Sequence, residues 1–140
     1  MASTTVVTWK EEMAFEVELD GHRFMIDADE KFGGKDRGPQ PKPLLLSSLA
    51  GCTGMDVVSL LNKMRMPFDD FKLEVVGEVA DEHPKVYNEI IIRYIFSGEE
   101  LDRDKIEKSV KLSLEKYCGV HAMLGKAAKI SYELVLNPSA

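Results

Sequence analysis

The 140-residue sequence has little of several features that would assign a function directly. It holds only two cysteines, too few for a small scaffold held together by disulfides. It lacks a phosphate-cradling glycine pattern and a dinucleotide-binding fingerprint. Basic residues number 18 against 24 acidic ones, and the resulting formal charge of −6 argues against a general nucleic-acid-binding protein.

Two further absences concern location. No N-terminal segment combines a basic start with an apolar core and a cleavage site, so we expect no secretory signal and a reducing, cytoplasmic location. The most apolar stretch, residues 44–61, contains serine, glycine, threonine and Asp56, and therefore predicts a buried helix rather than a membrane span. Hydrophobic content of 44% with 30% charged residues is typical of a globular protein, and the length predicts one domain over residues 1–140.

The first part of the chain predicts three strands. Residues 4–9 are rich in β-branched side chains, and residues 13–19 alternate between apolar and polar. Asp20-Gly21 is a strong signal for a two-residue turn into a returning strand at 22–27. Glycines and prolines then predict a charged loop over 29–43.

The rest of the chain predicts two helices and three strands. Residues 44–64 form a helix that is apolar on nearly all faces, and Pro43 suits its first position. Asp102 is the expected N-cap of the second helix, which ends near Cys118 with Gly119 as its stop. Strands are expected at 71–79, 86–96 and 130–136, so the order is βββ-α-ββ-α-β, an α+β fold.

The two cysteines, Cys52 and Cys118, lie at or near helix ends, where the environment can favour thiolate. Two such thiols brought together would form a pair that reduces peroxides or exchanges disulfides, whereas a single cysteine in a helix is more often a small buried core residue. A zinc site using Cys118 with His121, and Cys52, His22 or His83, is the competing chemistry. Zinc sites usually contain two close ligand pairs, and only one is present, so we predict no metal and no other cofactor.

The order of elements and the cysteine motifs together resemble the OsmC/Ohr family, the osmotically inducible and organic hydroperoxide resistance proteins. The resemblance runs from about residue 9 to residue 136. It is strongest in Pro41–Leu45, Leu49–Cys52 and Tyr117–Val120. The segments Gly33–Asp36 and Gly51–Val58 are most similar to the less-characterised OsmC-like branch.

This resemblance implies an intertwined homodimer whose central helices pack back to back inside wrapping sheets. It also implies that Cys52 attacks the oxygen of an organic or hydrogen peroxide. Cys118 then resolves the sulfenic acid as a disulfide, which a dithiol reductant reduces. The alternative is a non-enzymatic member of the fold that binds a small apolar or acidic ligand, or senses redox state.

One departure from the family concerns the charges beside the attacking thiol. Peroxidase members carry an Arg before the central helix and a Glu directly after the motif proline. Here Lys42 follows Pro41, so the Glu is absent, and no Arg clearly matches the position of the family's Arg before the central helix. Lys42 and Arg37 are the candidate electrostatic partners of Cys52, because a nearby cation lowers the pKa of a thiol. A lysine lacks the planar fork of arginine, so the replacement is not neutral.

Overall fold

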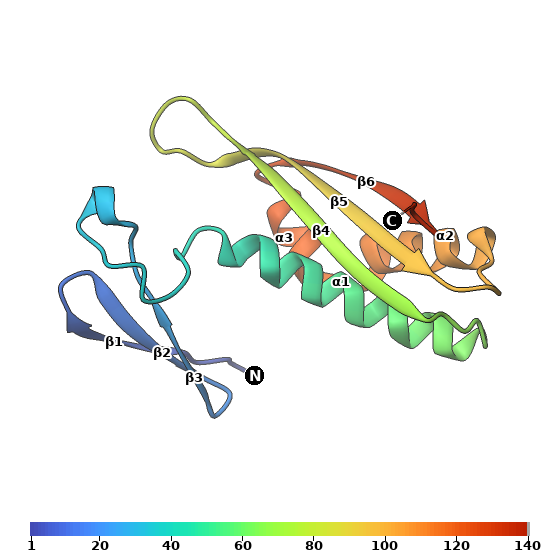
Figure 1. Cartoon of the computed structure of the whole chain (residues 1–140), viewed down its shortest axis with the longest axis horizontal. Helices are drawn as coiled ribbons and strands as arrows, with labels where there is room; N and C mark the ends of the chain where they lie inside the picture. The colour runs from blue at the N-terminus through green and yellow to red at the C-terminus, as the bar shows by residue number, and fades with distance from the viewer. Residues whose placement is uncertain (140) are drawn as a thin grey trace. The chain divides into compact units, whose positions relative to one another are not determined.

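The computed structural model describes residues 1–139 and divides into two compact units, Met1–Leu45 and a second unit from Leu46 onward (Figure 1). The first unit is a three-stranded antiparallel sheet in the order β1-β2-β3. Its elements are β1 (Val6–Glu11), β2 (Ala14–Leu19), β3 (His22–Ile26) and a 3-10 turn η1 (Glu30–Phe32). The three strands predicted for this region are therefore present.

The turn between β2 and β3 follows from its sequence. Asp20 and Gly21 have φ angles of 51° and 78°, both in the left-handed region, and Leu19 pairs with His22 on either side of them. A hairpin loop of two residues needs this backbone because its twist matches that of the flanking strands. Glycine adopts it without steric cost and aspartate tolerates it, which is why the dipeptide predicts the turn.

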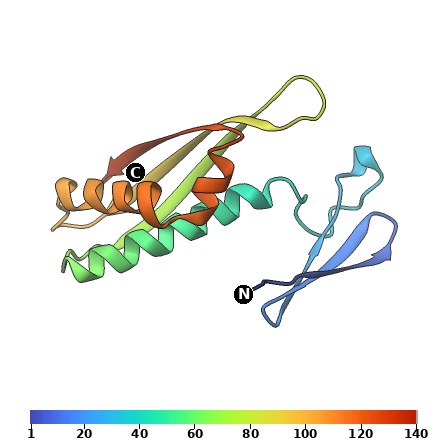
Figure 2. The same cartoon turned by 180° about the vertical axis from the view of Figure 1, so that it is seen from behind.

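The second unit is a three-stranded sheet with three helices. Strands β4 and β5 pair antiparallel, whereas β5 and β6 pair parallel, so the chain must cross over between them through its helices. Figures 1 and 2 show α1 and α2 running alongside this sheet. The elements are α1 (Leu44–Lys63), β4 (Asp70–Val79), β5 (Tyr87–Ser97), α2 (Arg103–Leu112), a π-helical turn η2 (Ser113–Tyr117), α3 (Gly119–Leu124) and β6 (Lys129–Leu136).

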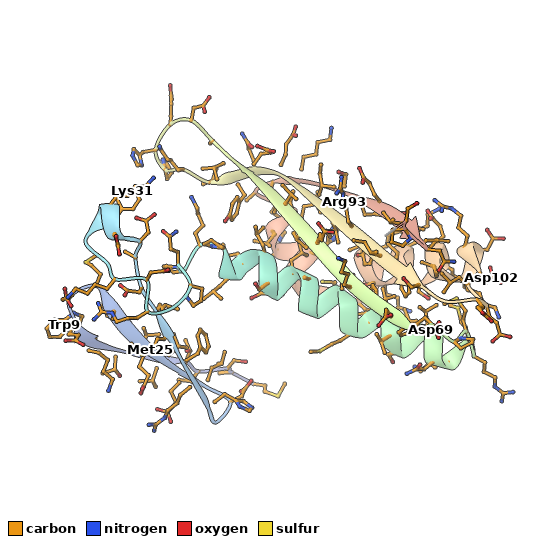
Figure 3. The ribbon with its side chains drawn as sticks, in the orientation of Figure 1. Trp9, Met25, Lys31, Asp69, Arg93 and Asp102 are labelled. Atoms are coloured by element: carbon orange, nitrogen blue, oxygen red, sulfur yellow. The ribbon has the colours of Figure 1, made fainter. Side chains whose placement is uncertain are left out.

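The core of this unit lies between one face of the sheet and the helices. Alternate residues of β5 are fully buried, as a strand with one covered face requires, and they pack with apolar side chains of α1 and α2. The opposite face carries both apolar and charged side chains. Arg93 of β5, labelled in Figure 3, pairs there with Glu133 of β6 at 3.1 Å. The fully buried apolar side chains are Leu49, Val57, Leu61, Ile90, Ile92, Tyr94, Phe96, Ile106 and Val110.

Helix α1 is covered on one side only. Leu49, Val57 and Leu61 are buried, whereas 76% of the Met55 side chain is exposed. Among the described residues α1 is the one helix long and apolar enough to cross a bilayer, a test that core helices of soluble proteins also pass. The sequence predicted a buried helix, and the single chain covers only part of it.

The helical segment between β5 and β6 differs in part from the prediction. Asp102 caps α2 as expected, and its carboxylate accepts from the Asp104 and Lys105 N–H groups at 3.0 and 3.3 Å. Gly119 was expected to stop this helix, and that expectation is wrong. The helix instead ends in the π turn η2, and Gly119 begins α3. Cys118 is therefore the residue between two helical segments rather than the end of one.

Candidate functional site

The two cysteines, far apart in sequence, lie together in the second unit. Both are free thiols, with Cys52 half-buried on α1 and Cys118 only 3% exposed. Cys52 lies close enough to Cys118 to raise the pKa of the Cys118 thiol. The pairing of these two residues was the main chemical prediction from the sequence, and the fold brings them near one another.

The backbone around Cys118 fixes the position of its sulfur. The Cys118 N–H donates to the Ser113 carbonyl at 2.7 Å, which closes the π turn. Its sulfur accepts from the His121 N–H at 3.3 Å and so acts as the N-cap of α3. Cys118 and His121, considered above as a pair of metal ligands, thus interact through the backbone N–H of His121. Within residues 1–139 no three metal-binding side chains cluster.

Burial raises the pKa of Cys118 to about 11. That net value includes a smaller lowering by the His121 N–H and smaller increases from the neighbouring Cys52 and Asp56. Near neutral pH Cys118 is consequently a protonated thiol. A protonated, enclosed thiol is poorly reactive by itself, so this environment suits a resolving cysteine rather than an attacking one.

A buried chain of hydroxyl groups lies beside the cysteines. Thr53 Oγ1 lies 2.8 Å from Tyr94 Oη and 2.7 Å from Ser113 Oγ, and Ser113 Oγ donates to Asp56 Oδ2 at 2.8 Å. Thr53, Tyr94 and Ser113 are fully buried, and Asp56 is half-buried. These four residues, the hydroxyl chain, join α1, β5 and η2. Of these four residues only Asp56 was named from the sequence, as a charge within the apolar stretch, and it was given no part in the site.

The two cationic candidates lie in the first unit. Arg37 Nε donates to the buried Asp27 carboxylate at 2.8 Å, and its Nη1 lies 3.2 Å from Glu12. Arg37 holds the pKa of Asp27 well below its usual range, with backbone N–H groups of the loop adding to the effect. Lys42 is an exposed residue of the turn that precedes α1. Their action on Cys52 stays a prediction.

An open apolar hollow of about 610 Å³ lies along the uncovered side of α1. Two glycines and an alanine of α1 make its floor shallow, and Phe71 and Leu73 of β4 form its edge. Near the end of the hydroxyl chain, Asp56 also lines a smaller hollow of about 180 Å³ together with Lys63 and Tyr117. The larger hollow is lined by Ala50, Gly51, Gly54, Met55, Val58, Ser59, Asn62, Phe71 and Leu73.

Comparisons with known proteins agree with this geometry. Residues 33–133 match the family described as OsmC-like protein. Protein YhfA of Escherichia coli K12 is 35% identical over 132 residues, which cover 92% of this chain and 96% of that protein. A crystal structure of a hypothetical protein from Aquifex aeolicus VF5 is 31% identical, with a TM-score of 0.83 and 99% of each chain covered.

A third comparison shows the fold alone. An organic hydroperoxide resistance protein OsmC from Legionella pneumophila is 13% identical, with a TM-score of 0.71 over 96% of this chain and 97% of that one. The family match and the YhfA identity each extend over most of the chain, and the cysteine pair lies inside both. This chain belongs to the OsmC-like protein family.

Proposed function

We propose that this protein reduces organic or hydrogen peroxides with a pair of thiols, as part of the response to oxidative stress. The observation that carries the proposal is the proximity of Cys52 to Cys118 within an OsmC-family fold. Two thiols in contact can pass from a sulfenic acid to a disulfide without large movement. The name of the Legionella protein, an organic hydroperoxide resistance protein, supports the same substrate class.

The proposed cycle balances as follows. The Cys52 thiolate attacks the terminal peroxide oxygen, the O–O bond breaks, and the leaving alkoxide takes a proton to become an alcohol or, from hydrogen peroxide, water. Cys52 is then a sulfenic acid. The Cys118 sulfur attacks the Cys52 sulfur, and water leaves with the Cys118 proton. An external dithiol returns two electrons and two protons to the disulfide.

The roles of the two cysteines follow from their surroundings. Cys52 is the more exposed of the two, so a peroxide reaches it first. Cys118 is buried, and its raised pKa keeps it as a thiol until the sulfenic acid forms beside it. Lys42 and Arg37 are proposed to favour the Cys52 thiolate. Because the cycle needs an intracellular dithiol, we place the protein in the cytoplasm.

We further propose that the protein is a homodimer. The exposed side of α1 leaves Met55 and the apolar hollow uncovered, and the sheet of the first unit exposes Val7, Trp9 and Phe24. Exposed apolar surface of this kind marks an interaction site. The small residues of α1 allow close approach of a second helix, so we expect the central helices of two subunits to meet there.

One observation favours the alternative function, non-enzymatic binding of a small ligand. The hollow along α1 has the volume of a small-molecule site and a mostly apolar lining. A ligand held there by both subunits would need neither thiol. Under that alternative the cysteines are core residues or redox sensors, and replacing them leaves ligand binding unchanged.

The test is consumption of cumene hydroperoxide and hydrogen peroxide by purified protein with dithiothreitol as reductant. We expect the Cys52→Ser variant to lose turnover, because the attacking sulfur is gone. The Cys118→Ser variant should turn over more slowly, since the external thiol must then reduce the sulfenic acid directly. Equal consumption by wild type and Cys52→Ser would reject the enzymatic proposal.

A further inference from the structure

Ser113 connects the two segments that carry the cysteines. Its carbonyl accepts the Cys118 N–H at 2.7 Å, so it fixes the start of the turn that ends at Cys118. Its hydroxyl is hydrogen-bonded to Thr53 at 2.7 Å and to Asp56 at 2.8 Å, and these residues follow Cys52 on α1 within about one helical turn. Through one buried residue the position of Cys118 is therefore tied to the helix of Cys52.

The hydroxyl chain has one direction. The Ser113 hydroxyl has a single hydrogen, which it donates to the Asp56 carboxylate. In its bond with Thr53 it must therefore accept, so Thr53 donates to Ser113, and Tyr94 in turn donates to Thr53. Burial raises the pKa of Tyr94 well above its usual value, which keeps the phenol a donor. Asp56 is the last acceptor of the hydroxyl chain, and its hydrogen bond with Ser113 determines which hydroxyl donates in each of the other bonds.

The turn that Ser113 begins is an uncommon one. Residues 113–117 form a π helix, in which the Cys118 N–H bonds five residues back instead of four. Such turns are rare, and they occur frequently at functional sites. Here the turn ends at the buried thiol, and the first residue of the turn is the one anchored to α1.

We propose that Asp56 and Ser113 are positioning residues that hold Cys118 against Cys52 and thereby set how readily the two thiols join as a disulfide. The proposal rests on the proposed function only in taking these cysteines as the reacting pair. Without the anchor, η2 is no longer fixed to α1, and the effective concentration of one thiol at the other falls. The role of Asp56 is to accept a hydrogen bond, so a neutral acceptor of the same shape preserves most of it.

The test is the equilibrium of the thiol pair with reduced and oxidised glutathione at one fixed pH, without any peroxide. Two protein thiols lose two electrons and two protons, and one oxidised glutathione gains them to give two reduced molecules. Acid-quenched samples are analysed by mass for the intramolecular disulfide. The variants are Ser113→Ala, Asp56→Ala and Asp56→Asn. The matched control is Ser109→Ala, a buried serine on α2 whose hydroxyl donates to its own helix at Lys105.

We expect Ser113→Ala and Asp56→Ala each to lower the equilibrium constant for disulfide formation about tenfold, equivalent to about 30 mV. Asp56→Asn and Ser109→Ala should stay within about twofold of wild type, since neither removes the anchor. Circular dichroism of each variant checks that it folds, and Asp56→Ala is the second test should Ser113→Ala unfold.

Two results would overturn the proposal: equal constants for Ser113→Ala and Ser109→Ala, or no Cys52–Cys118 disulfide in wild type at any glutathione ratio. Because no peroxide is used, the result does not depend on peroxidase activity. An active peroxidase with unchanged constants rejects the positioning role alone. A protein that consumes no peroxide, but shows the expected differences, keeps the positioning role and loses the proposed function.

Discussion

The hydroxyl chain makes a strong prediction about stability at Thr53. Threonine and valine have nearly the same size, so Thr53→Val removes a buried hydroxyl without opening a cavity. Thr53 is fully buried and lies between Tyr94 and Ser113 at 2.8 and 2.7 Å. After the change Ser113 keeps Asp56 as its acceptor, whereas the Tyr94 hydroxyl is left buried without Thr53 as partner. An unsatisfied buried group costs about 1–3 kcal/mol, so we expect about 2 kcal/mol of lost stability.

The measurement is urea or thermal unfolding at fixed protein concentration with reductant present. A loss of about 2 kcal/mol corresponds to a fall in Tm of about 6 °C for a chain of this length. The exposed Thr8→Val serves as control and should change stability by less than about 0.5 kcal/mol.

A double-mutant cycle with Tyr94→Phe separates the hydrogen bond from general disruption. Tyr94→Phe removes the donor and leaves Thr53 bonded to Ser113, so it should cost about 1 kcal/mol. In the double variant neither partner is left unsatisfied, and the total loss should be smaller than the sum of the two single losses by about 1 kcal/mol. A Thr53→Val loss below about 0.5 kcal/mol, or strict additivity, would refute the reasoning.

Three further predictions concern the interface, the buried thiol and the loop. Met55→Glu should convert the proposed dimer to monomer in analytical ultracentrifugation without unfolding it, because this side chain is 76% exposed in the single chain. In the folded protein the pKa of Cys118 is about 11, against an ordinary value of 9.0. As the pH rises the unfolded state therefore loses the thiol proton first, and the free energy of unfolding should fall between about pH 9 and about pH 11. The Cys118→Ala variant should show a smaller fall over the same range. Gly34→Ala should cost more than about 2 kcal/mol in chemical denaturation, because a Cβ there overlaps the Ala28 carbonyl, whereas Gly119→Ala, in open space, should be tolerated.

Much of the fold could be predicted because its signals are local. The Asp20-Gly21 turn and the Asp102 cap each depend on residues within a few positions of one another, and both were predicted correctly. Helix α3 was missed because it has only six residues, too few to show a period, and because a cysteine sulfur caps it instead of a serine or aspartate oxygen. The glycine that begins it was read as the end of the preceding helix.

The candidate site likewise contains one part that the sequence could predict and one that it could not. The cysteine pair was predictable because reactive residue types are few in this chain and the family motifs contain both. The hydroxyl chain was not, since Thr53, Tyr94 and Ser113 come from three elements whose packing register no single sequence discloses. The available signal was weak: a threonine and a serine at positions where the helical pattern calls for apolar side chains.

The most direct test of the central claim is the intact mass of the protein after one equivalent of cumene hydroperoxide, without reductant. The account predicts that wild type loses about 2 Da as the Cys52–Cys118 disulfide forms. Cys118→Ser should gain about 16 Da at Cys52, in a form that dimedone traps, and Cys52→Ser should remain unchanged. A wild type that keeps its mass, or a Cys52→Ser variant oxidised as readily as wild type, would contradict it.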